Sequence, residues 1–67
     1  MNLDLAVYIG EKIKYFRKTH NWTQSQLGEK VGLAKSTVAN YEKGFRTPQQ
    51  DKLFDIADAL GISVSDL

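Results

Sequence analysis

The sequence predicts an all-α protein, a compact bundle of four to five short helices that forms a single domain over residues 1–67. Apolar residues recur every three or four positions along nearly the whole chain, and no stretch keeps the period of two that marks a strand. The chain has one proline, and a glycine follows three of the predicted helices as a terminator. Because 67 residues can bury only one small core, a second domain is excluded.

The first helix is predicted from about residue 4 to about residue 19. Leu5, Ile9, Ile13 and Phe16 are spaced by four, four and three positions, which places them on one apolar stripe. His20 follows this helix, and we expect its ring to cap C-terminal carbonyl groups rather than to serve catalysis or to bind a metal.

The second helix is predicted from its capping residues. Thr23 and Gln26 match the capping box, in which each side chain bonds the backbone amide of the other residue. Trp22 precedes the cap and is expected to pack against Leu27 as a hydrophobic staple. Gly32 stands where a left-handed residue ends a helix, so this helix covers about eight residues.

Two further helices follow the same logic. The third is predicted over about 35–43 and ends at Gly44. Thr47 and Pro48 indicate the start of the fourth, because proline suits the first helical position. The fourth helix ends at Gly61, and its apolar face consists of Leu53, Ile56, Ala57 and Leu60.

The last residues carry one more helix start. Ser63 to Asp66 reads as an N-cap pattern with only one residue behind it. One interpretation, which we favour, is that the natural chain continues and residues 1–67 form the N-terminal part of a longer protein. The other is a short fifth turn packed by Ile62, Val64 and Leu67.

Composition excludes several classes of protein. The chain has no cysteine, so it has neither disulfides nor a cysteine zinc site, and no apolar run is long enough to span a bilayer. The chain has a single histidine, and its sequence shows neither paired carboxylates in a plausible cleft nor a phosphate-binding glycine loop. We therefore expect no enzyme activity, no metal and no cofactor. A cytoplasmic protein without a membrane partner is expected.

Charge is unevenly distributed along the chain. Residues 11–46 carry eight basic and three acidic side chains, a net charge of +5, whereas residues 51–67 carry −3. This asymmetry fits a polyanion bound on one side, although an ordinary solvated surface explains it equally well. Asp51, Asp55 and Asp58 lack the alternating oxygen ligands of a calcium loop, so they are interpreted as a solvated face.

The second and third predicted helices, joined by a turn of about three residues, have the layout of a helix-turn-helix. Their steep crossing needs a small residue at the contact, where Gly28 stands, and a backbone reversal at Gly32. The expected inward-facing residues are Leu27, Val31, Val38 and Tyr41.

The outer face of the third helix is polar or small throughout. At about 100° per residue, one contiguous face collects Lys35, Ser36, Ala39, Asn40 and Lys43. Such side chains match the hydrogen-bonding groups and thymine methyls of the DNA major groove. Any amphipathic helix has a polar outer face, but the absence of acidic residues here favours DNA.

The segment from Thr23 to Gly44, TQSQLGEKVGLAKSTVANYEKG, resembles the helix-turn-helix of the lambdoid phage repressors, of Cro and of their XRE-type bacterial relatives. The similarity extends over nearly the whole chain, from IGEKIKYFRK to LFDIADALGISVSDL. It implies a lambda-repressor-like fold with the helix-turn-helix at about 23–44.

The resemblance also implies roles for individual residues. The positions at base edges are Lys35, Ser36, Ala39 and Asn40. The positions at DNA phosphates are Thr23, Gln24, Thr37, Lys43 and Arg46, with the Gln24 amide also bracing the first residues of the third helix. For Thr37, a merely solvated or buried hydroxyl is as good an interpretation. Arg17 and Glu42 match an ion pair between the first and third helices.

The resemblance implies a sequence-specific transcriptional regulator, of the type of a phage or prophage repressor. It would bind double-stranded DNA as a homodimer on a palindromic operator, an inverted repeat, with its third helix in the major groove. An anti-repressor or a C-terminal regulatory domain is the further partner implied. The alternative is an antitoxin-like or adaptor module that uses the same fold to bind proteins.

Three positions depart from the family pattern. Gly28 replaces the usual alanine, which destabilises the second helix by about 1 kcal/mol because glycine has a lower helix propensity. Ala34 stands where serine or threonine caps the third helix. Residues 1–8 form no basic arm and are expected to lengthen the first helix or to pack on a partner. Phe45, after the third helix, fits a core lid, a DNA backbone contact or a dimer contact.

Overall fold

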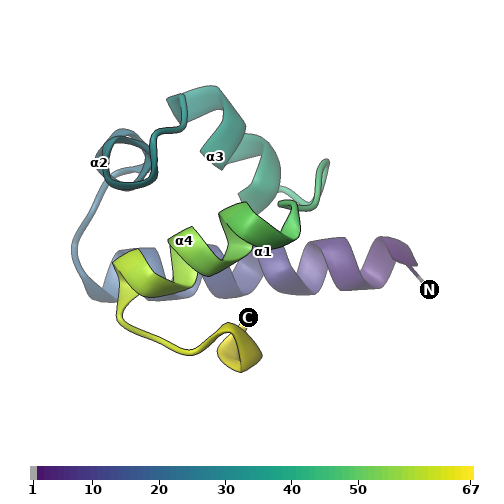
Figure 1. Cartoon of the computed structure of the whole chain (residues 1–67). Coiled ribbons are helices and arrows are strands. Elements are labelled where there is room, and N and C mark those ends of the chain that lie inside the picture. The colour runs from purple at the N-terminus through teal and green to yellow at the C-terminus, as the bar shows by residue number, and fades with distance from the viewer. Residues whose placement is uncertain (1) are drawn as a thin grey trace.

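The computed structural model describes residues 2–67, with side chains from residue 5 onward, and confirms the all-α prediction (Figure 1). Its elements are α1 (Asn2–Thr19), α2 (Gln24–Val31), α3 (Lys35–Glu42), α4 (Gln50–Leu60) and a closing 3₁₀ turn, η1 (Val64–Asp66). The residues before the predicted start of the first helix therefore lengthen it. None of the helices in this described part of the chain combines the length and the apolarity needed to cross a membrane.

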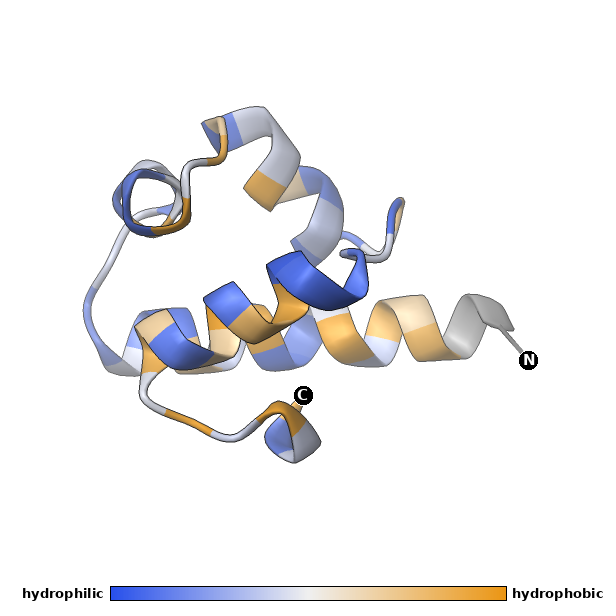
Figure 2. Cartoon of the chain, viewed as in Figure 1, coloured by the Kyte–Doolittle hydropathy of each residue, from blue (hydrophilic) through white to orange (hydrophobic). Residues whose placement is uncertain are grey.

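The helices enclose one small core. In Figure 1, α1 runs along the base and α2 and α3 lie above it, while α4 packs against α1 and α2 and leads into η1, which is seen below α1 in this view. The four largest fully buried side chains come one from each helix: Ile13, Leu27, Val38 and Ile56. Hydrophobic segments of all four helices accordingly turn toward the space between them (Figure 2).

The apolar stripe of α1 is buried only in part. Ile9 and Ile13 are buried and Phe16 packs against the core, but Leu5 is 56% exposed. The predicted stripe therefore lies on one helix, but its N-terminal member stays largely exposed. The N-terminal turns of α1 extend past α2, α4 and η1 in the view of Figure 1.

The predicted start of the fourth helix at Thr47 and Pro48 is also wrong. The helix begins at Gln50, and its N-cap residue Gln49 makes no side-chain capping bond. Pro48 is instead buried in the connection after α3. Because the proline ring packs into the protein, residues 47–49 remain part of the loop, and the first helical turn begins at Gln50.

The other helix ends follow the capping predictions. Thr23 and Gln26 form the capping box of α2, and Gly32 and Gly61 both adopt a left-handed φ of 72° after their helices. Ser63 and Asp66 cap η1 in the same way, which gives the short fifth turn. That the natural chain continues beyond residue 67 remains a prediction.

His20 caps a different helix from the one expected. Its Nε2 lies 2.8 Å from the carbonyl oxygen of Leu60, at the C-terminus of α4 rather than of α1. The imidazole also stacks on the ring of Trp22, with 4.3 Å between the ring centroids. His20 therefore joins the ends of two helices that are 40 residues apart.

Two glycines allow helices to approach unusually closely. A Cβ atom added at Gly10 of α1 would lie 2.2 Å from the carbonyl oxygen of Tyr41 and 2.8 Å from that of Glu42. One added at Gly28 would lie 2.4 Å from the carbonyl oxygen of Leu33. Glycine at position 28 therefore lowers helix propensity but permits the tight α2–α3 turn. This agrees with the predicted need for a small residue where the two helices meet.

We predict that Gly10→Ala destabilises the fold, although alanine is the better helix former. The added methyl group meets backbone atoms that cannot rotate away, which costs about 1–3 kcal/mol. In a domain of this size the melting temperature should fall by at least about 5 °C. Thermal unfolding followed by circular dichroism tests this, with the exposed Ser25→Ala as control. A melting temperature equal to or above that of the parent would contradict the prediction.

Candidate nucleic-acid interface

The α2–turn–α3 unit has the predicted helix-turn-helix geometry. Gly32 reverses the chain in its left-handed conformation, and the amide of Leu33 donates to the carbonyl oxygen of Gly28 at 2.8 Å. Ala34 is the N-cap of α3 and makes no side-chain capping bond. The first amide groups of α3 are therefore left without a side-chain partner, as the departure at Ala34 predicts.

The outer face of α3 is uncovered. Lys35 and Ser36 are exposed, and Ala39 and Asn40 are partly exposed. Val38 and Tyr41 turn into the core on the opposite side. The predicted base-reading residues therefore share one open face. Glu42, the one acidic residue of α3, is buried and paired, so the open face carries no acid.

Four groups meet where α1, α2 and α3 converge. Arg17 and Glu42, which are 7% and 8% exposed, form a two-pronged ion pair. Nε of Arg17 donates to Oε2 of Glu42 at 2.6 Å and NH2 donates to Oε1 at 3.0 Å. The remaining NH1 donates to the carbonyl oxygen of Trp22 at 2.6 Å. The network ties the end of α1, the loop before α2 and the end of α3 together.

Gln24 completes this network and corrects one expectation. Its Nε2 donates to Oε1 of Glu42 at 3.0 Å. The expectation that its amide braces the first residues of α3 is wrong, because it contacts the last residue of that helix instead. The carboxylate of Glu42 lies within reach of the N-terminus of α2 and offers a stronger acceptor than a neutral group.

The other residues predicted to contact phosphates differ in exposure. Thr23 is exposed, and its hydroxyl accepts from the amide of Gln26 at 3.1 Å. Thr37 is half-buried beside the open face of α3. Lys43 and Arg46 are both exposed in the loop after α3. These cations therefore flank the C-terminal end of α3, whereas Thr23 lies at the start of α2.

Phe45 lies between those two cations. Its side chain is 73% exposed, which excludes the role of a core lid. Nζ of Lys43 lies 5.8 Å from the centroid of its ring. The interpretations as a DNA backbone contact and as a dimer contact remain predictions.

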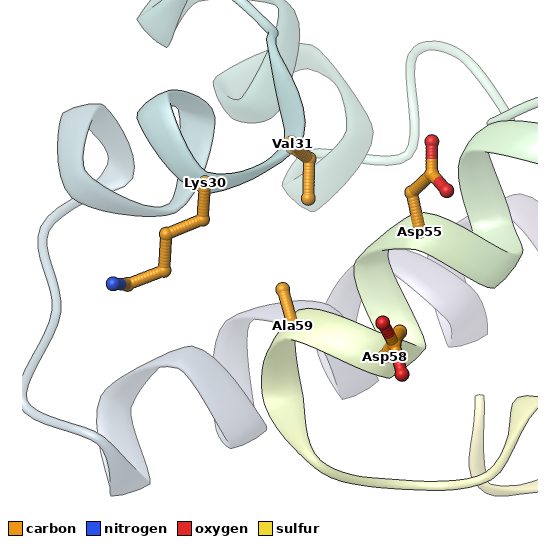
Figure 3. Close-up of a pocket in the computed structure, with 5 residues that line it drawn as sticks. All are labelled: Lys30, Val31, Asp55, Asp58 and Ala59. Carbon is orange, nitrogen blue, oxygen red and sulfur yellow. The ribbon is translucent and has the colours of Figure 1, made fainter.

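The acidic side of the molecule lies elsewhere. Figure 3 shows a groove between α2 and α4, lined by Lys30, Val31, Asp55, Asp58 and Ala59. Asp51, Asp55 and Asp58 are all exposed on α4, as predicted for a solvated face. Their negative charge would repel a polyanion from α4 and leave α3 as the favourable side of approach.

Sequence reasoning missed one link between α2 and α4. Nζ of Lys52 donates to the carbonyl oxygen of Val31 at 2.9 Å and lies 3.6 Å from Oδ2 of Asp55. A lysine that caps a helix 21 residues earlier leaves no local signal. The Lys52–Asp55 pair alone has a helical spacing that sequence could indicate.

We predict that Glu42→Ala severely destabilises the domain. It leaves the Arg17 charge buried without its partner, a loss of about 3–5 kcal/mol. That is comparable with the whole stability of a 67-residue domain, roughly 3–10 kcal/mol. Urea unfolding measures the loss, and reduced DNA binding should follow from it. Replacing both partners, as in Arg17→Met/Glu42→Leu, should restore part of the stability. An unchanged unfolding midpoint for Glu42→Ala would contradict the role given to the pair.

The chain resembles regulators from bacteria, phages and archaea. An uncharacterised helix-turn-helix transcriptional regulator of Methanocaldococcus jannaschii is 38% identical over 56 residues, 84% of this chain and 85% of that protein. The cryptic phage CTXphi transcriptional repressor of Vibrio cholerae is 37% identical over 88% of this chain and 53% of its own length. The immunity repressor of Bacillus phage phi105 is 42% identical over 85% of this chain, which spans 40% of that repressor.

Solved structures show the same fold. The restriction-modification controller protein C.AhdI from Aeromonas hydrophila superimposes with a TM-score of 0.89 at 25% identity, over 96% of this chain and 93% of that one. The biofilm master regulator SinR, solved in complex with DNA, superimposes with a TM-score of 0.80 at 36% identity, over 85% and 92% of the two chains. The helix-turn-helix family profile matches residues 13–67. The chain therefore belongs to the XRE-type helix-turn-helix family.

Proposed function

We propose that this domain binds double-stranded DNA sequence-specifically, as the operator-binding part of a transcriptional repressor. The observation that carries the proposal is the open face of α3, which displays Lys35, Ser36, Ala39 and Asn40 and no acidic group. A DNA complex of SinR, which is 36% identical, supports this function. The phage repressors among the relatives support repression.

The proposed reading of bases follows from the chemistry of each side chain. Lys35 suits the N7 and O6 acceptors of guanine, and the Asn40 amide suits N6 and N7 of adenine. Ser36 donates to or accepts from either base pair. The methyl group of Ala39 suits a thymine methyl, and its small size lets the helix approach the groove closely.

Phosphate contacts would hold α3 in place. The capping box occupies the amides of Thr23 and Gln26, so the amides of Gln24 and Ser25 in the same turn are available to a phosphate. Thr37 would add a hydroxyl beside the reading face. Lys43 and Arg46 would bind the backbone at the other end of α3. These contacts give affinity that depends on salt, whereas the face of α3 gives sequence preference.

The proposed complex is a homodimer on a palindromic operator. A single domain of this size covers little DNA, and two-fold pairing doubles the contact on half-sites about one helical turn apart. The two phage repressors extend beyond the matched region, which covers 53% of one and 40% of the other, and this supports a C-terminal regulatory domain as a further partner. An anti-repressor is the other partner proposed. Such a regulator would act in the cytoplasm and carry out no enzymatic reaction.

We predict that selection from a random duplex library recovers an inverted repeat. Against the recovered site, Asn40→Ala should lose roughly tenfold or more in affinity and should discriminate less at one base position. Fluorescence anisotropy with the site and its single-base variants measures both effects. If no motif is enriched and Asn40→Ala leaves the DNA affinity unchanged, the result would contradict the proposal and favour the antitoxin-like or adaptor interpretation.

We further predict that Arg46→Ala weakens binding equally on every sequence. Because the variant loses one phosphate contact, the slope of log affinity against log salt should fall by about one. Titrations at several salt concentrations test this, with Lys30→Ala as a charge-matched control beside the acidic groove. Equal slopes for Arg46→Ala and the parent would remove Arg46 from the proposed interface.

A further inference from the structure

Residues 5–15 of α1 carry a second line of large side chains that lie largely outside the core. Leu5, Tyr8 and Tyr15 are 56%, 49% and 62% exposed. Together with Lys12 they follow spacings of three, four and three, which is the pattern of the seam between paired helices. A contiguous set of exposed apolar and aromatic groups marks an interaction surface, whereas isolated ones do not.

This line lies away from the DNA-reading side. At about 100° per residue, Tyr8 and Tyr15 are about 140–160° around the helix from Ile13, which faces the core. Gly10, against which α3 packs, lies on the other side of Ile13. Tyr8, Glu11, Lys12 and Tyr15 line one open groove, here called the Tyr8–Tyr15 face.

Charge is arranged on the Tyr8–Tyr15 face in a definite order. Tyr8 and Tyr15 are seven residues apart, so they lie on one line nearly parallel to the helix axis. Glu11 and Lys12 are neighbours, about 100° apart, and flank that line on opposite sides at nearly the same height. Nζ of Lys12 lies 5.4 Å from the centroid of the Tyr8 ring, so the ammonium group already reaches over this face.

Such a face is complementary to itself. A two-fold axis parallel to α1 would set Tyr8 against the partner's Tyr8 and Tyr15 against the partner's Tyr15. The same rotation exchanges the flanks, so each Glu11 would meet the partner's Lys12 and two reciprocal ion pairs would form. An antiparallel pair would instead bring equal flanks together, Glu11 with Glu11 and Lys12 with Lys12, which is unfavourable.

We propose that the Tyr8–Tyr15 face binds a second copy of this chain, with the two α1 helices side by side and parallel. The aromatic pairs would supply the contact area, and the ion pairs would select the parallel arrangement. The contact leaves α3 open in both copies. It would therefore allow one DNA-bound copy to recruit another to a neighbouring site without altering base reading.

Cysteine trapping tests the arrangement directly, because the chain contains no cysteine. Tyr8→Cys and Tyr15→Cys would each place a thiol opposite its own counterpart. Under mild oxidation without DNA, each should form a disulfide-linked dimer several times faster than Lys14→Cys, an exposed control on another side of α1. Rates equal to the control would overturn the proposal. Cross-linking only in a mixture of the two tyrosine variants would overturn it in favour of an antiparallel pair.

Charge reversal tests the same contact with both tyrosines in place. In sedimentation equilibrium, Glu11→Lys and Lys12→Glu should each raise the dimer dissociation constant about tenfold, because both pairs become repulsive. The double variant Glu11→Lys/Lys12→Glu should recover the parent value. Lys14→Glu changes the net charge as Lys12→Glu does and should leave the dimer unchanged. A parent that stays monomeric at millimolar concentration, or a double variant that is not rescued, would overturn the proposal.

Discussion

The buried ion pair between Arg17 and Glu42 is the constraint on which the rest of the structure depends. One guanidinium group holds the end of α1, the loop at Trp22 and the end of α3, and Gln24 adds the start of α2 through the same carboxylate. Burying these charges is costly unless every polar atom has a partner. Among the described residues no buried side-chain nitrogen or oxygen lacks one. The helix-turn-helix is therefore fixed to α1 at a defined distance and angle.

Close backbone approach supports the same junction. Gly10 lets α1 rest directly against the last carbonyl groups of α3, and Gly28 lets α2 fold back onto the turn at Leu33. A larger residue at position 10 would push α1 away from α3 and so strain the hydrogen bonds between Arg17 and Glu42. Gly10 and the charged pair thus meet at the same point, because the residue whose backbone contacts Gly10 also carries the paired carboxylate, Glu42.

Sequence alone predicted most of the fold and a defined part of the site. The capping box at Thr23 and the glycines at 32 and 61 act within a few residues of one another, so their local pattern was sufficient. The helix start at Pro48 was misread and the exposure of Leu5 was not predicted, because the burial of both residues depends on how neighbouring segments pack, which no local pattern records. The contacts from His20 to Leu60 and from Lys52 to Val31 were missed for the same reason.

The uncapped start of α3 separates two tasks within one short helix. Its C-terminal end holds the buried network, whereas its N-terminal end presents the exposed side chains of Lys35 and Ser36. Substitutions at exposed positions away from caps and networks usually change stability little, so the fold should tolerate changes at these two. In the proposed complex, single mutations at these positions would therefore change the base preference of α3 while the fold stays intact, so new binding preferences need no compensating change elsewhere in the domain.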